Sequence, residues 1–183
     1  MKKRSPAERS IRADYQQHGA EGFYRAEGAQ YRNPHEAAIG RVLRHVVANW
    51  PLDQSHVLDL ACGSGEITLA LRALGAGRID GIDPFTYQAY QQRTGLVAGR
   101  ESFEAIAEGA LAGRHYSLIV CSFALHLVAP SRLPLLCFRL GEISTVLLVI
   151  TPHKRPDLRP EWGWVLAEET VIERVRARLY QRQ

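Results

Sequence analysis

A short loop containing glycine and a more distant aspartate are the residues whose types and spacing could do chemistry. The loop, Asp59–Glu66, reads Asp-Leu-Ala-Cys-Gly-Ser-Gly-Glu and follows an apolar run that is typical of a buried strand. Its glycines allow a sharp turn and let a ligand approach the backbone. Asp83 lies 20 residues after Gly63, at the end of the next apolar run. A carboxylate at that distance can accept hydrogen bonds from ribose hydroxyl groups, so these residues predict a nucleoside site.

Charge in the loop separates two kinds of nucleoside cofactor. A dinucleotide places its pyrophosphate at the N-terminus of the following helix, where Glu66 would repel it. Thr68 also stands where the third glycine of the G-x-G-x-x-G pattern belongs. S-adenosylmethionine (SAM) has no phosphate and carries a cationic sulfonium, which Asp59 and Glu66 would attract. The residues therefore favour SAM over a nicotinamide dinucleotide.

Three segments resemble the motifs of class I SAM-dependent methyltransferases. Val57–Gly65 resembles their first motif, Gly81–Asp83 their second, acidic motif, and Tyr116–Ser122 their fourth-strand motif. The order and spacing match from about residue 33 to the end of the chain. The resemblance implies an α/β fold: a Rossmann-like three-layer sandwich whose seven-stranded sheet is mostly parallel and ends in an antiparallel C-terminal hairpin.

The resemblance also implies a set of cofactor contacts and argues against some acceptors. The residues expected to bind SAM are Asp59, Ala61, Cys62, Gly63, Gly65, Asp83, Pro84, Phe103, Glu104 and Ser122. Phe103 and Glu104 would lie near the adenine. Ala61 replaces the family's usual first glycine, and Ser117 replaces its usual fourth-strand aspartate. The chain has neither an N/D-P-P-Y/F motif nor a catalytic Pro-Cys, so exocyclic base nitrogens and pyrimidine C5 lose support as acceptor atoms.

Polar residues after the fourth and fifth predicted strands are candidates for contact with the methyl acceptor, because ligands of open α/β sheets bind at the carboxyl ends of the strands. His126 follows the fourth strand, and the alternative to a catalytic role is a histidine that packs within its loop. His153, Lys154 and Arg155 lie between two prolines after the fifth strand. A stiff cationic segment fits an anionic acceptor, and the alternative is a solvated loop. We assign candidate catalytic roles to His126, His153 and Lys154, and acceptor binding to Arg155.

The segment before the first predicted helix, residues 22–33, contains two tyrosines and two glycines in an irregular stretch. It predicts a lid over the cofactor, in which Tyr24, Tyr31 and Arg32 contact the acceptor. The alternative is an aromatic staple that holds the segment onto the domain.

Short apolar runs alternate with helical patterns after residue 50, which predicts βαβ units and a parallel sheet. We expect strands over residues 56–60, 78–82, 100–104, 116–123, 145–151, 164–171 and 174–180. We expect helices over residues 34–50, 66–74, 85–93 and 132–140. Asn33 should cap the first helix in a capping box with Glu36, and Ser131 should cap the last. The last strand alternates arginines with apolar residues, so we expect one of its faces to be solvated.

The bulk properties are those of one globular domain. The chain has 183 residues, of which 46% are hydrophobic and 23% charged. We expect a flexible basic tail over residues 1–12, a lid and helix over 13–50, and a methyltransferase core over 51–183. The three cysteines, Cys62, Cys121 and Cys137, lack CxxC spacing and fit buried residues in a reducing compartment. With no apolar segment typical of a signal peptide or a membrane span, we expect a cytoplasmic protein without a metal site.

The sequence therefore predicts a SAM-dependent methyltransferase that releases S-adenosylhomocysteine (SAH). A small acceptor is favoured, because the chain has no room for a separate substrate domain. An RNA methyltransferase is one alternative, since the net charge of +4 and the pI of about 9.1 permit an RNA partner. A non-catalytic SAM-binding or partner-stabilising subunit is the other.

Overall fold

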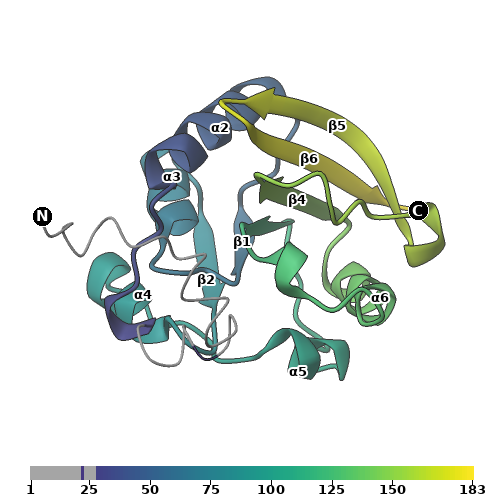
Figure 1. The fold of residues 1–183 in the computed structure, drawn as a ribbon, viewed down its shortest axis with the longest axis horizontal. Helices are drawn as coiled ribbons and strands as arrows, with labels where there is room; N and C mark the ends of the chain where they lie inside the picture. The colour runs from purple at the N-terminus through teal and green to yellow at the C-terminus, as the bar shows by residue number, and fades with distance from the viewer. Residues whose placement is uncertain (1–21, 23–27) are drawn as a thin grey trace, which may run out of the picture.

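A mixed β-sheet forms the centre of the molecule, whose computed structural model describes residue 22 and residues 28–183 (Figure 1). Within these residues, six strands lie in the order β2-β1-β3-β4-β6-β5. Their bounds are β1 His56–Leu60, β2 Arg78–Ile82, β3 Leu118–Ser122, β4 Val146–Thr151, β5 Trp164–Ile172 and β6 Val175–Arg182. Strands β1 to β4 are parallel, and β6 is antiparallel to both β4 and β5. The predicted mostly parallel sheet with an antiparallel C-terminal hairpin is confirmed.

The strand predicted over residues 100–104 is absent from the described sheet, which has six strands instead of the expected seven. Gly99 alone pairs with the edge of β2, through a single parallel bridge to Ile82. Ser102 then caps a helix, α5 (Phe103–Ala107), by accepting a hydrogen bond from the backbone amide of Ala105 at 3.3 Å. The local preference of serine for a helix N-cap therefore ends the strand after one residue.

Helices cover both faces of the sheet and give the predicted three layers (Figure 1). The longer ones are α2 (Glu36–Asn49), α3 (Glu66–Ala73), α4 (Tyr87–Thr94) and α6 (Leu133–Ile143). Along β1, Val57 packs in the cluster that contains α2 and α3, whereas Leu58 packs in the cluster that contains α5 and α6. Leu118 and Ile119 of β3 alternate in the same way. This burial on both faces is why the central strands are nearly continuous apolar runs.

Two of the predicted helix caps are wrong. His35 is the N-cap residue of α2, and the Asn33 side chain instead accepts the His35 amide at 2.9 Å. The carboxylate of Glu36 pairs with Arg93 of α4 at 2.6 Å, so a tertiary ion pair replaces the capping box. Helix α6 follows Arg132 without a side-chain cap. A cap at Ser131 would accept the backbone N–H of residue 133 or 134, and residue 134 is a proline, which has none.

The face of β6 that was expected to be solvated is largely covered. Arg178 and Tyr180 are buried, and the segment between β4 and β5 packs over them. Leu158 of that segment is buried and donates its backbone amide to the Tyr180 hydroxyl at 3.4 Å. Tertiary cover by a loop therefore overrides the exposed position that the alternating pattern indicated.

No helix in the described part of the chain is long and apolar enough to cross a membrane. The predicted tail over residues 1–12 lies outside the described residues, as does Tyr24.

Candidate functional site

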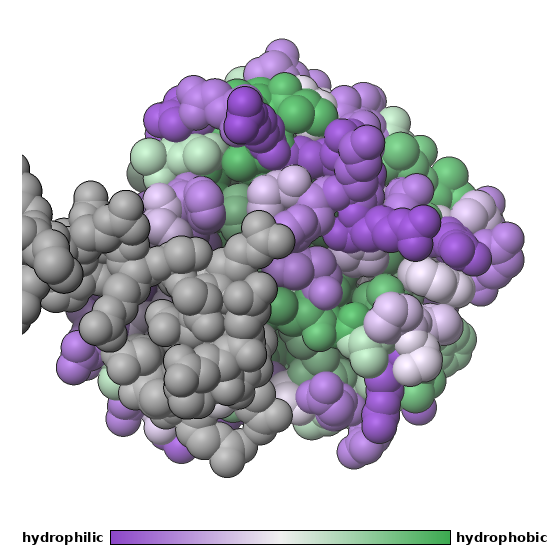
Figure 2. Space-filling model, in the orientation of Figure 1, coloured by the Kyte–Doolittle hydropathy of each residue, from purple (hydrophilic) through white to green (hydrophobic). Residues whose placement is uncertain are grey.

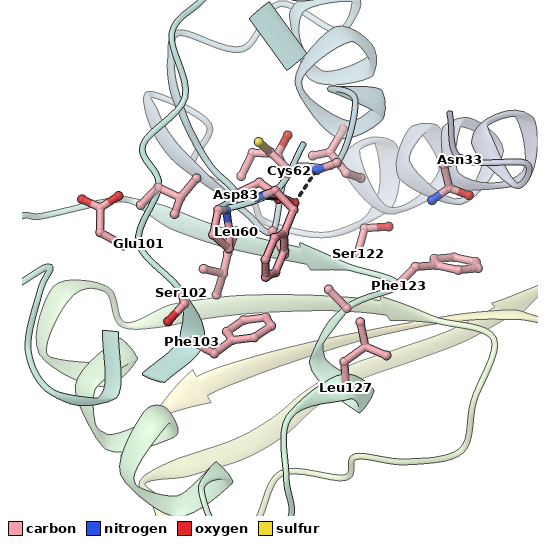
Figure 3. A pocket seen from close by; sticks show the side chains of 18 of the residues that line it. Asn33, Leu60, Cys62, Asp83, Glu101, Ser102, Phe103, Ser122, Phe123 and Leu127 are labelled. Atoms are coloured by element: carbon pink, nitrogen blue, oxygen red, sulfur yellow. Dashed lines mark hydrogen bonds between the residues drawn. The ribbon is translucent and has the colours of Figure 1, made fainter. Parts of the chain in front are cut away.

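A cavity of about 360 Å³ opens at the carboxyl ends of β1, β2 and β3. Its size is within the roughly 300–1,000 Å³ of small-molecule sites. One end carries Glu101, Ser102 and Phe103, and the other carries Ser122 and Phe123, among other residues (Figure 3). In the space-filling view, apolar side chains gather near the centre of the face that is shown (Figure 2).

Nearly all of the predicted cofactor residues line this cavity. They are Asp59, Ala61, Cys62, Gly63, Asp83, Pro84, Phe103, Glu104 and Ser122. Gly65 is the exception, because it lies behind the loop against Tyr90 and Thr94 of α4. The cavity therefore collects residues from four loops that are far apart in the sequence.

The glycine loop turns through left-handed backbone conformations. Gly65 has φ +90° and is the N-cap residue of α3. Gly63 has φ +56°, and a Cβ there would lie 3.4 Å from the ring of Tyr31. Ala61 adopts φ +56° although it has a Cβ, which is a strained position at the cavity wall. Tyr31 thus lies close over the loop at the cavity.

Asp83 holds two of the loops together. One carboxylate oxygen accepts the backbone amides of Phe85 at 2.8 Å and Thr86 at 2.9 Å. The other accepts the amide of Gly63 at 3.3 Å. A carboxylate has about four acceptor positions, so Asp83 keeps roughly one for a ligand.

Asp59 is fully buried beneath the loop. Its Oδ2 accepts the backbone amide of Thr68 at 3.1 Å and the Thr68 hydroxyl at 2.7 Å, while its Oδ1 has no partner. Burial raises the pKa of Asp59 to about 7, and the nearby charges of Glu66 and Asp83 add to the increase. Burial therefore favours the protonated form of this carboxyl group.

Glu66 does not contribute an isolated negative charge, contrary to the electrostatic argument made from the sequence. Its carboxylate pairs with the guanidinium of Arg93 at 3.2 Å and contacts the Ser64 hydroxyl. The same oxygen accepts the backbone amide of Asn33 at 3.2 Å. Arg93 also pairs with Glu36, and its side chain is only 13% exposed. Glu66 thus links the residues just before α2 to the glycine loop after β1.

Comparison with known proteins places this geometry in context. No protein-family model matches the chain. Uncharacterized protein C17A5.05c of Schizosaccharomyces pombe is 32% identical over 94% of this chain and 92% of that protein. The two proteins belong to one family. The magnesium protoporphyrin IX methyltransferase of Synechocystis PCC 6803, solved with bound SAM, superposes with a TM-score of 0.62 and 17% identity, covering 94% of this chain and 96% of that one.

Two further solved structures have the same architecture. A ribosomal protein L11 methylase of Lactobacillus delbrueckii subsp. bulgaricus gives a TM-score of 0.58 at 15% identity, covering 84% of this chain and 81% of that one. A SAM-dependent methyltransferase of Aquifex aeolicus gives a TM-score of 0.58 at 13% identity, covering 81% and 93%. The chain has the class I SAM-dependent methyltransferase fold. The resemblance seen in the three sequence motifs is thereby confirmed at the level of the fold.

Several residues of this methyltransferase fold that line the cavity were not predicted from the sequence. Glu101 accepts Arg114 with one carboxylate oxygen at 2.7 Å, and its other oxygen, Oε2, is buried without a partner. Phe123 has φ +56°, stacks on His35 with ring centroids 5.2 Å apart, and lines the opposite end. Glu101 could have been noticed in the sequence, because it is the acidic residue of the segment Gly-Arg-Glu-Ser, residues 99–102. The strain at Phe123 has no counterpart in the sequence.

The residues predicted to be catalytic, His126, His153 and Lys154, are not part of the cavity lining. The rings of His126 and His153 are in contact, with centroids 4.4 Å apart. His126 belongs to η3 (Leu125–Leu127), whose Leu127 does line the cavity and is 39% exposed. Lys154 is exposed beside His153.

Arg32 and Arg155 are also exposed and lie outside the cavity lining. Of the N-terminal residues predicted to contact the acceptor, Tyr31 is the one that the structure places in the lining.

Proposed function

We propose that the protein transfers a methyl group from SAM to an acceptor bound at the same cavity. The observation that carries the proposal is the charge of the cavity wall. Among the described residues, the lining contains five carboxylates and no lysine, arginine or histidine. The carboxylates are Asp59, Glu66, Asp83, Glu101 and Glu104. Arg93 offsets the charge of Glu66, Arg114 offsets that of Glu101, and burial favours the protonated form of Asp59. Asp83 and Glu104 therefore supply most of the negative charge of the wall, which attracts a cationic sulfonium and repels a pyrophosphate.

The orphaned polar atoms support an orientation of the cofactor. Glu101 Oε2 lies at the end of the cavity that also carries Phe103, so we assign it to the adenine amino group (Figure 3). The remaining acceptor position of Asp83 is assigned to a ribose hydroxyl. Ser122 Oγ is buried without a partner at the opposite end, which leaves it for the methionyl part or the acceptor.

SAM, when bound, supplies an electrophilic methyl group, so the chain's own task is to position the nucleophile and to exclude water. The stacked Phe123 and the apolar Leu127 bound the acceptor end of the cavity. Burial, and then the neighbouring His153, lower the pKa of His126 to about 4. A group with this pKa is neutral at pH 7 and is a poor proton acceptor. We therefore assign His126 a positioning role, in which it packs against the ring of His153. We assign the contact with the acceptor to His153.

Calorimetry with SAH and with NAD⁺ tests the cofactor assignment. We expect heat of binding with SAH and none with NAD⁺, because the wall repels phosphate. Glu101→Gln should weaken SAH binding by about tenfold, since a hydrogen bond to a charged group contributes about 1.5–3 kcal/mol.

Glu108→Gln is the matched control, because Glu108 is exposed just after α5 and lies outside the lining. Binding of NAD⁺ without binding of SAH would contradict the proposed function. An unchanged affinity in Glu101→Gln would contradict only the adenine assignment.

A further inference from the structure

We propose that the methyl acceptor carries a carboxylate or phosphate group, and that Lys154 and Arg155 bind this group at the rim of the cavity. The inference rests on the proposed function and names the chemical class of its acceptor. It is drawn from how the segment after β4 is held, where it lies, and which of its charges are unpaired.

A buried arginine fixes the backbone of this segment from below. The Arg178 guanidinium donates hydrogen bonds to the carbonyl oxygens of Lys154 and Pro156, both at 3.0 Å. Its Nε donates to Glu169 of β5 at 2.6 Å, and its side chain is only 7% exposed. The Thr151 hydroxyl accepts the backbone amide of His153 at 3.1 Å. The positions of the two cationic residues are therefore set by the sheet, whereas their side chains are exposed.

The segment lies beside the acceptor end of the cavity. It begins directly after β4, at the same edge of the sheet as the loop after β3. The contact between His153 and His126 joins it to η3, and Leu127 of that turn lines the cavity. An acceptor with an apolar body over Leu127 and Phe123 would thus present a substituent to the rim.

The charges of Lys154 and Arg155 have no acidic partner among the ion pairs of the described residues. The nearby acid, Asp157, contacts Arg178 at 3.9 Å and accepts the Tyr180 hydroxyl at 3.1 Å. The exposed cationic side chains of Lys154 and Arg155 can bind an anionic group of the acceptor. The carboxylates that line the cavity would repel that group, so it would stay outside the cavity.

The surrounding surface favours a small acceptor over RNA. Arg176 and Arg178 both pair with Glu169, and Arg41 pairs with Glu173 at the turn of the hairpin. These pairs take three arginines away from a cationic track that would extend Lys154 and Arg155, and leave Arg159 and Arg174 without an ion pair among the described residues. A backbone of many phosphates needs such a track, but a single anionic group does not.

Ligand-observed NMR on the full chain saturated with SAH tests the inference, with benzoate, phenyl phosphate and the neutral benzamide as probes. We expect at least one of the two anions to bind roughly tenfold tighter than benzamide, as for a charge-assisted contact. The comparison of benzoate with phenyl phosphate distinguishes a carboxylate from a phosphate acceptor. In the double variant Lys154→Gln, Arg155→Gln, the preference for the anions over benzamide should disappear. The control variant Arg44→Gln, on the exposed face of α2, should retain this preference.

The SAH affinity of each variant is measured first, which separates the two proposals. Absence of SAH binding in the unmodified chain contradicts the proposed function. Normal SAH binding, combined with no anion preference or with a preference that survives the double variant, overturns this inference alone. Salt-dependent binding of an oligouridylate that the double variant loses, without a preference for small anions, would assign the rim to RNA instead.

Discussion

Individual carboxyl groups at the cavity differ in their charge because they differ in their partners. Asp83 accepts three backbone amides, and Glu66 is paired with Arg93. Asp59 is fully buried, and its one side-chain partner is Thr68. Burial therefore raises its pKa to about 7 from the ordinary value of 3.8. The negative charge that meets a cationic ligand depends on these contacts and cannot be counted from the number of acidic residues.

The raised pKa of Asp59 predicts a pH dependence of stability. Between pH 4 and 7 the folded state holds a proton that the unfolded state has released, so rising pH favours unfolding over this range. Wild type should lose a few kcal/mol relative to Asp59→Asn as the pH rises from 4 to 7, since a difference of one in pKa is worth about 1.4 kcal/mol.

Urea unfolding of the ligand-free proteins at several pH values measures this difference. The lowered pKa of His126 acts in the opposite direction, but both proteins retain His126, so its effect cancels. A constant difference across this range would show that Asp59 is ionised throughout.

At the scale of elements, the loop after β1 depends on close packing between α3 and α4. Tyr90 of α4 donates to or accepts from Thr68 of α3 at 3.0 Å, and Arg72 of α3 donates to the carbonyl oxygen of Thr94 at 2.9 Å. Gly65 stands between the two helices, where a Cβ would overlap the Thr94 methyl group. The position therefore requires glycine for space as well as for its left-handed backbone.

Gly65→Ala should destabilise the fold by more than a strained backbone alone explains. Gly75 provides the matched control, because its φ of +88° is close to the +90° of Gly65 but nothing lies within 4 Å of its Cβ position. We expect Gly75→Ala to cost about 1–2 kcal/mol and Gly65→Ala about 1–3 kcal/mol more. Chemical denaturation of both variants gives the comparison, and equal costs would mean that α4 moves away without penalty.

At the scale of the whole molecule, the hairpin of β5 and β6 extends the sheet beyond β4 and contacts α6. Strand β6 covers the edge of β4, which would otherwise present unpaired backbone groups. Trp164 at the start of β5 is completely buried, and its indole N–H donates to the carbonyl oxygen of Cys137 in α6 at 2.9 Å. The hairpin is thus part of the core, although none of its residues lines the cavity.

Trp164→Ala should cost about 3–5 kcal/mol, because it leaves a large cavity between β5 and α6. That cost is a large share of the 5–15 kcal/mol that typically stabilises a folded domain. Leu166→Ala, two residues further along β5 and 44% exposed, should cost far less. Thermal unfolding of the two variants tests this expectation, and similar melting temperatures would show that the hairpin is not a structural part of the domain.

Local sequence patterns predicted the positions of six strands and of most helices, and the place of the glycine loop after β1. They could do so because strand and helix periodicity and glycine turns depend on residues that are neighbours in the chain. The failed prediction of a strand over residues 100–104 also had a local cause, the cap formed by Ser102. Most cofactor residues were named from the motifs and lie in the cavity wall, while their contacts with SAM stay predictions.

Tertiary structure alone decided which charges are neutralised and which polar atoms face the cavity. Arg93 pairs with Glu36 across 57 residues, and Arg178 donates to the carbonyl oxygen of Lys154 across 24. No local pattern encodes such partners, because they meet only when the sheet brings distant loops to one edge. The same folding buries Glu101 Oε2 and Asp59 Oδ1 without partners, on two residues that line the cavity from different loops.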